Sequence, residues 1–164
     1  MNLVPCPGCG GLFSEIEGPT HRYMESSTGC WAMYGEVLAR EYSNPAYAPN
    51  YRLSVDAYAV QHPGRPSPQS VQSVAVHLIR LCLLLERDLE MARANDAMLT
   101  ATAAKGKFFW LEPPPSRGSI TVADVHRAKN ADEHIALVQK WAESAWQAWS
   151  RHHPQIHKWL PGRV

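Results

Sequence analysis

The strongest pattern of hydrophobic and polar positions lies between residues 69 and 95. Apolar side chains recur there every three to four residues, which is the repeat of one face of an α-helix. The repeating positions are Val71, Val74, Leu78, Leu81, Cys82, Leu85 and Leu89. Four more apolar residues widen this face: Val76, Ile79, Leu83 and Leu84. A helix that is apolar around so much of its circumference is typical of the centre of a fold.

Four other segments are predicted to be helical, and they cover residues 30–43, 50–61, 121–129 and 130–152. Most of them begin after a side chain that can accept a hydrogen bond from the free N–H groups of a first turn. These caps are Ser27 or Thr28, Thr121 and Asn130. Ser67 followed by Pro68 marks the start of the central helix in the same way.

The remaining segments lack helical periodicity. Residues 1–28 are dominated by Gly, Pro, Ser and Thr, which predicts irregular structure. Residues 108–111 are predicted to be a short extended piece, paired with residues 119–120. We therefore predict a mainly α fold of four to five helices around the central apolar helix, with at most a short β hairpin. The parts of this single domain (1–164) are an irregular N-terminal segment (1–28), a helical core (29–95), a loop or extended segment (96–120) and C-terminal helices (121–164).

The length and charge of the chain argue against some classes of function. The 164 residues carry 16 Lys and Arg against 15 Asp and Glu, so the formal net charge is only +1. Binding to nucleic acid or to an anionic membrane normally leaves a strongly basic footprint. The longest apolar run, residues 74–85, is interrupted by His77 and Arg80 and is shorter than the roughly 20 residues of a membrane span. The first residues do not resemble a signal peptide. We expect a cytoplasmic protein with neither nucleic acid nor membrane as partner.

The N-terminal segment contains the motif CPGCG at residues 6–10. Two thiolates three residues apart can hold one Zn²⁺, and glycines let the backbone turn tightly around the sulfurs. The alternative is a thioredoxin-type redox pair of Cys6 and Cys9, but such a pair normally opens a helix after a strand. Here glycine and proline flank the motif instead. The segment is therefore interpreted as a zinc knuckle.

The motif has no second CxxC partner, so the other ligands must come from elsewhere. Cys30 is the best third ligand, because the start of a helix stabilises a thiolate. Cys82 lies in the apolar face of the central helix and is interpreted as a core residue.

Three histidines compete for the fourth position: His21, His62 and His77. His21 lies in the same loop as the knuckle, so that its closure costs little chain entropy. His62 ends the second predicted helix. His77 belongs to a polar stripe of the central helix, which must find polar partners when it is buried. Asp56 is a candidate to orient one of these ligands, or to act as a general base if the metal keeps an open position.

Several motifs together resemble a bacterial family of unknown function. They are CPGCG at residues 6–10, GCW at 29–31, VDAY at 55–58 leading to QHP at 61–63, and SVAVHL at 73–78. The resemblance covers most of the first 90 residues and carries no known activity. It implies that six residues belong together: Cys6, Cys9, Cys30, Asp56, His62 and His77. It thereby favours His62 and His77 over His21 as ligands.

Three functions fit this set of residues. The first is a zinc-binding helical protein in which the metal has a structural role, with Cys6, Cys9, Cys30, His62 and His77 as the candidate ligands. The second is a zinc-dependent, hydrolase-like enzyme with water at an open coordination position. The third is an interaction or adaptor module that meets a protein partner, or a second copy of itself in a homodimer, through exposed aromatic side chains.

Overall fold

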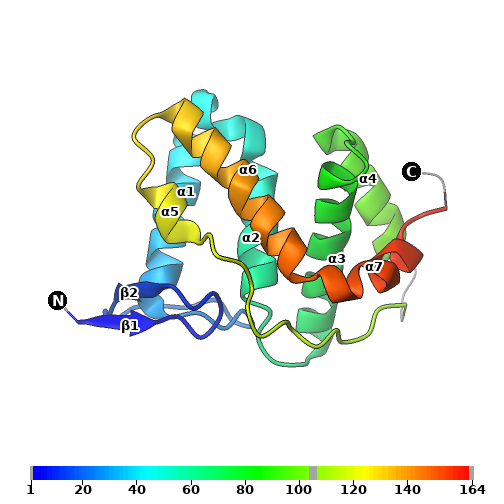
Figure 1. Cartoon of the computed structure of the whole chain (residues 1–164), viewed down its shortest axis with the longest axis horizontal. Helices are drawn as coiled ribbons and strands as arrows, with labels where there is room; N and C mark the ends of the chain where they lie inside the picture. The colour runs from blue at the N-terminus through cyan, green and yellow to red at the C-terminus, as the bar shows by residue number, and fades with distance from the viewer. Residues whose placement is uncertain (1, 104–106, 163–164) are drawn as a thin grey trace.

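The computed structural model describes residues 2–103 and 107–162 and confirms the mainly helical fold (Figure 1). Its first half contains β1 (Leu3–Pro5), β2 (Leu12–Ser14), α1 (Thr28–Ser43), the 3-10 helix η1 (Pro45–Asn50), α2 (Tyr51–Gln61) and α3 (Pro68–Leu85). Its second half contains α4 (Met91–Thr102), α5 (Val122–His126), α6 (Ala131–Ala148), the 3-10 helix η2 (Ser150–His152) and α7 (His153–Trp159).

The predicted helix starts are confirmed. Ser27 caps α1, Ser67 caps α3 with Pro68 in its first turn, Thr121 caps α5 and Asn130 caps α6. In each case the side-chain oxygen accepts a hydrogen bond from a backbone N–H of the first turn. These starts follow from local chemistry alone, which explains why the sequence predicts them.

The helix α3 occupies the centre, as its apolar pattern predicts, and packs against α2, α4, α6 and α7. It is the one described helix that is long and apolar enough to cross a membrane, but 56% of that stretch is buried inside the fold. Leu78, Ile79 and Leu81 have no exposed surface. Its apolar face is therefore covered by other helices of the same chain.

The helix predicted over residues 69–95 is in fact two helices. After Leu85 the chain turns: the Arg87 N–H bonds back to the Cys82 carbonyl, and Asp88 takes a φ of +51°. The helix α4 then continues to Thr102, within the segment predicted to be a loop or extended piece. Leu89 still packs against the core. The apolar repeat of the sequence therefore continues across the break between the two helices, and the break cannot be recognised from this repeat.

The β hairpin lies at the N-terminus rather than at residues 108–120. Strands β1 and β2 are antiparallel, with Val4 opposite Phe13. No strand occurs in the described residues 107–121. Phe108 and Phe109 instead pack their rings against Trp159, at centroid distances of 5.1 and 5.2 Å. Residues 104–106 of the predicted loop segment lie outside the described residues.

The short helix α2 is more deeply buried than its sequence suggests. Every residue from Asp56 to His62 is buried, although three of the seven are polar. The polar groups have partners: the Gln61 amide nitrogen donates to the Arg117 and Ile120 carbonyls, and its oxygen accepts from the Trp141 indole. Because α2 packs against both α3 and α6, the end of α2 that carries His62 is held firmly in place.

Candidate metal centre

The β1–β2 turn places the first two cysteines. The Cys6 N–H donates to the Gly11 carbonyl at 2.8 Å, and the Gly10 N–H donates to the Cys6 carbonyl at 2.9 Å. Gly10 has a φ of +77°, a conformation that favours glycine. The motif therefore forms a tight knuckle between two strands, and Cys6 is buried while Cys9 is half-buried.

The start of α1 brings a third cysteine to the knuckle. Ser27, the cap of this helix, donates its backbone N–H to the Cys6 sulfur at 3.4 Å. Its side-chain oxygen accepts from the Cys30 N–H. The sulfur of Cys30 then lies 4.0 Å from that of Cys9. This separation is about twice an S–S bond, so the cysteines are free thiols.

His62, at the end of α2, completes the group. Its Nδ1 lies 2.7 Å from the Tyr58 carbonyl oxygen, which can only accept, so Nδ1 carries the proton. Its Nε2 is then left with a free lone pair and lies 3.4 Å from the Cys30 sulfur. A carbonyl that fixes the tautomer in this way is the usual support of a metal-binding histidine.

Tyr58 also holds the surroundings of the ring. Its own ring stacks on that of His62 at 3.9 Å, and its hydroxyl lies 3.4 Å from the Cys30 sulfur. On the knuckle side, a Cβ at Gly8 would overlap the His62 imidazole. Gly8 is therefore required because the knuckle backbone presses directly against this histidine.

The ligand-type atoms of Cys6, Cys9, Cys30 and His62 all lie within 4.8 Å of one another. A tetrahedral zinc site needs S···S separations of about 3.8 Å and S···N separations of about 3.5 Å. The Cys9–Cys30 and Cys30–His62 distances of 4.0 Å and 3.4 Å are close to these values. The donor set and its geometry therefore fit a tetrahedral Cys3His ion, and this group is named the Cys3His cluster.

The thiols of the cluster compete for their protons. Hydrogen bonds from Cys30 and Cys9 lower the pKa of Cys6, and the contact with Cys6 raises the pKa of Cys30. The hydrogen bond with Cys30 lowers the pKa of Cys9. The hydrogen bond with Cys6 and the burial of the thiol together have the larger, opposite effect, and they raise the pKa of Cys9 to about 12. Only one of the three thiols ionises readily without a cation. A dication would stabilise all three thiolates and release the remaining protons.

Arg117 supplies a positive charge next to the knuckle. Its Nη1 donates to the Gly8 carbonyl at 2.6 Å and to the Pro7 carbonyl at 3.3 Å. Burial lowers the pKa of Arg117, whereas Glu25, Cys6 and Cys9 act to raise it. A divalent ion with three thiolates has a net charge of −1, and this guanidinium would balance it.

A comparison with known protein families identifies the family to which the chain belongs. Residues 4–150 match the model of DUF5946, a family of unknown function. The protein belongs to this family. No curated protein and no solved structure matches the chain. The predicted resemblance to a family of unknown function is thus confirmed, and the chemistry of this DUF5946 protein must be argued from its own residues.

Two of the histidines weighed as ligands lie outside the cluster. His21 uses its Nδ1 to accept hydrogen bonds from the Tyr23 and Met24 N–H groups, and its ring packs edge-on against Trp31. His77, predicted as a ligand, places its Nδ1 2.7 Å from the Asp56 carboxylate instead. Because the Asp56 carboxylate on the neighbouring helix is the hydrogen-bond partner of His77, this histidine is not part of the Cys3His cluster.

Asp56 forms the centre of a separate network on α2 and α3. Its fully buried carboxylate accepts from Arg80 Nε at 2.8 Å and from Nη2 at 2.6 Å, in addition to the His77 contact. Arg80 also donates to the Asn95 side chain at 3.1 Å. Asp56, Arg80 and His77, named the Asp56 network, satisfy one another. As a predicted general base, Asp56 has no oxygen free of these partners.

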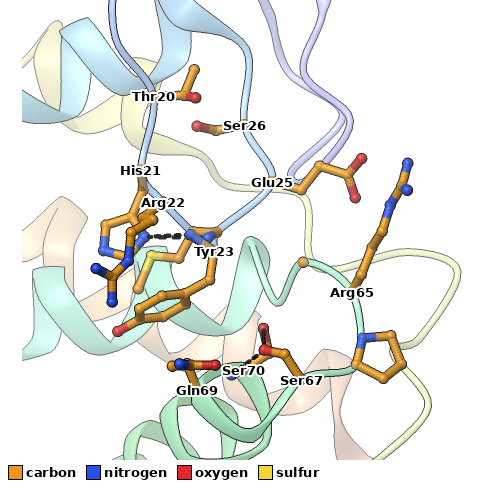
Figure 2. A pocket seen from close by; sticks show the side chains of 13 residues that line it. Thr20, His21, Arg22, Tyr23, Glu25, Ser26, Arg65, Ser67, Gln69 and Ser70 are labelled. Atoms are coloured by element: carbon orange, nitrogen blue, oxygen red, sulfur yellow. Dashed lines mark hydrogen bonds between the residues drawn. The ribbon is translucent and has the colours of Figure 1, made fainter.

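A pocket lies between the loop of residues 20–26 and the start of α3 (Figure 2). Its volume is about 550 Å³, and Arg22 and Arg65 are among its lining residues. The two walls approach closely where Gly64, with a φ of +72°, meets the Tyr23 carbonyl. The loop wall ends at the Ser27 cap, which contacts Cys6 and Cys30. An ion in the Cys3His cluster would therefore fix one wall of this pocket.

Sequence reasoning missed the groups that support the cluster. Tyr58 stands four residues before His62, which is the spacing of one helical turn, and this could have indicated the contact. The sequence predicts Ser27 as a helix cap but does not predict it as a donor to Cys6. Arg117 carries no such signal, because it lies 109 residues from Gly8 in the chain.

Proposed function

We propose that this DUF5946 protein binds one Zn²⁺ through Cys6, Cys9, Cys30 and His62, and that the ion is structural. The single observation that carries this proposal is the convergence of three free thiols and one imidazole lone pair within 4.8 Å. Soft sulfur ligands with one imidazole favour zinc over magnesium, calcium or manganese. The ion would tie the β hairpin to the start of α1 and the end of α2.

Burial supports a structural role over a catalytic one. Cys6, Cys30 and His62 are almost completely inaccessible to solvent, and four protein ligands fill a tetrahedral shell. Zinc enzymes normally keep a position for water. Asp56, the general base of the hydrolase alternative, is occupied by Arg80 and His77. Although Cys6 and Cys9 line a pocket of about 310 Å³, four protein ligands leave no coordination position for water, so the arrangement favours the structural role.

The test is metal content coupled to folding. Purified protein should carry one zinc per chain, measured by plasma mass spectrometry. A strong chelator should remove the zinc and lower the melting temperature together, because binding and folding are linked. Cys30→Ser should lose the zinc, whereas His21→Gln, a change at a histidine outside the cluster, should keep it. A well-folded protein without zinc would refute the proposal.

A second candidate function is that of a binding module whose pocket is ordered by the metal. The pocket of about 550 Å³ beside the loop of residues 20–26 favours it. Arg22 and Arg65 lie on opposite sides of this pocket in Figure 2, and either could bind a carboxylate or phosphate group of a small ligand. A thermal-shift screen of such compounds should give hits that are lost in Arg65→Gln and after zinc removal. Hits that survive Arg65→Gln would place binding elsewhere.

Protein partners and cellular location are further proposals. Among the side chains that the structure describes, the exposed aromatic ones are Tyr42 and Phe109, while each tryptophan is buried or half-buried. A partner or a second copy of the chain would therefore meet Tyr42 or Phe109 rather than a tryptophan. The three free thiols of the cluster suit a reducing compartment, which supports the bacterial cytoplasm. Sedimentation of the wild type and of Tyr42→Ser would test self-association.

A further inference from the structure

A second group of ligand-type side chains lies where α7 packs against α3 (Figure 1). It consists of Cys82 and Glu86, one turn apart on α3 and its cap, and His157 on α7. The Cys82 sulfur is 3.6 Å from Glu86 Oε2, and His157 Nε2 is 2.7 Å from the same oxygen. The three ligand-type atoms lie within 4.8 Å of one another.

The imidazole of His153 also faces this group. Its Nε2 lies 3.0 Å from the Trp146 carbonyl oxygen, which accepts only, so Nε2 carries the proton. The other nitrogen, Nδ1, then points toward Glu86 Oε1 at 3.7 Å. This distance is longer than a hydrogen bond, so Nδ1 is positioned to act as a fourth ligand atom.

The group is also held in place by its neighbours. The His153 ring stacks on the Trp146 ring at 3.7 Å, and the Trp146 indole donates to Glu86 Oε1 at 3.1 Å. Cys82 is buried, while the side chains of Glu86 and His157 are 32% and 40% exposed. An ion could therefore enter from solvent, and a coordination position would stay open toward it.

We propose that Cys82, Glu86, His153 and His157 form a second, weaker site, which binds a divalent transition metal ion of the zinc or cobalt type only when that ion is added to the purified protein with one zinc per chain. One sulfur, one carboxylate oxygen and two imidazole nitrogens suit these borderline ions. Binding would displace the Cys82 thiol proton and the proton now shared by His157 and Glu86, and both protons would leave to solvent. The ion would separate His157 and Glu86 by roughly half an ångström, to the spacing of ligands on one metal.

The site is independent of the Cys3His cluster, so the test uses the full-length protein with its first ion in place. Co²⁺ is added to the zinc-loaded protein, and absorption in the near ultraviolet is followed. Coordination by the Cys82 thiolate should produce a sulfur-to-cobalt charge-transfer band that saturates at one Co²⁺ per chain. Protein that carries no ion at the Cys3His cluster would show a second, stronger set of bands, which separates the two proposals.

Two variants and a control complete the test. His157→Gln changes a half-exposed side chain and should weaken Co²⁺ binding by at least about tenfold. Cys82→Ser should abolish the charge-transfer band. The control is His126→Gln: His126 Nε2 lies 2.6 Å from Glu36 Oε2 in an exposed pair, and this change should leave binding unaltered. A wild-type protein without the band, or a band that persists in Cys82→Ser, would overturn the proposal.

Discussion

The Cys3His cluster and the Asp56 network are two buried polar groups that meet the same helix, α2, yet they differ in what they lack. In the Asp56 network a carboxylate faces a guanidinium and an imidazole, so charges and hydrogen bonds balance within the chain. In the Cys3His cluster three thiols and an imidazole lone pair face one another, with the Arg117 guanidinium bound to the knuckle backbone beside them. Three thiols and an imidazole that converge on one point become four metal ligands once the thiols lose their protons, so they suit an external dication. A metal ion thus fits one group and is superfluous in the other.

The largest effect is expected from removing a sulfur of the Cys3His cluster. Cys6→Ser should lose the zinc, and with it a large part of the roughly 10–16 kcal/mol with which structural zinc sites stabilise small zinc domains. The hairpin should detach and the melting temperature should fall steeply. Zinc content and thermal unfolding by circular dichroism measure both effects. A Cys6→Ser protein that melts like the wild type would show that no ion ties the hairpin down.

The next largest effect should come from the Asp56 network, without loss of metal. Asp56→Asn leaves the buried Arg80 without its carboxylate partner, which costs about 3–5 kcal/mol in the free energy of unfolding. His77→Gln removes a weaker contact and should cost about 1–2 kcal/mol. Urea unfolding measures both costs. Zinc content should stay at one per chain in each variant, and a loss of zinc in His77→Gln would restore His77 as a ligand.

A glycine pair tests the contact between the knuckle and His62. Gly8→Ala places a methyl group where the His62 ring lies and should destabilise the protein by about 1–3 kcal/mol while weakening zinc binding. Gly35→Ala, in α1, meets nothing within 4 Å and should be neutral or stabilise the helix by up to about 1 kcal/mol. A competition assay with a coloured chelator gives the zinc affinities. Equal affinities in the two variants would contradict the described contact.

The smallest effect should come from Arg117. Arg117→Gln removes the positive charge beside the thiolates and two hydrogen bonds to the knuckle, and should lower zinc affinity by about tenfold. Arg117→Lys keeps the charge and should recover part of the loss. The same chelator competition measures both variants. If Arg117→Gln binds zinc as tightly as the wild type, the guanidinium does not balance the site.

Lowering the pH should weaken zinc binding by the Cys3His cluster. Zinc binding requires the cysteines as thiolates and His62 as neutral imidazole, so protons compete with the ion and affinity falls as pH falls. Zinc release on lowering the pH, followed with a fluorescent zinc indicator, should coincide with loss of the hairpin. A protein that retained its zinc until global unfolding in strong acid would contradict this coupling.

Features governed by a few adjacent residues could be predicted from the sequence. The caps at Ser27, Ser67, Thr121 and Asn130 depend on one side chain and its own first turn. The apolar repeat of α3 likewise predicts its central place. The break after Leu85 could not be predicted, because Leu89 continues the repeat and the reversal depends on a bond from Arg87 back to Cys82.

The centre itself was predictable only in part. The chemistry of Cys6, Cys9, Cys30 and His62 indicated a metal, but the sequence could not rank His62 above His77. That ranking depends on tertiary contacts: the Tyr58 carbonyl directs His62 toward the cysteines, and Asp56 captures His77. Arg117 reaches the knuckle only through the folded chain, so its role had no trace in local sequence.

X-ray absorption at the zinc edge of the purified protein tests the central claim most directly. The account predicts one zinc per chain, with three sulfur ligands at about 2.3 Å, one nitrogen at about 2.0 Å and no water oxygen. A folded protein without zinc, or a shell with fewer than three sulfurs and a bound water, would contradict it.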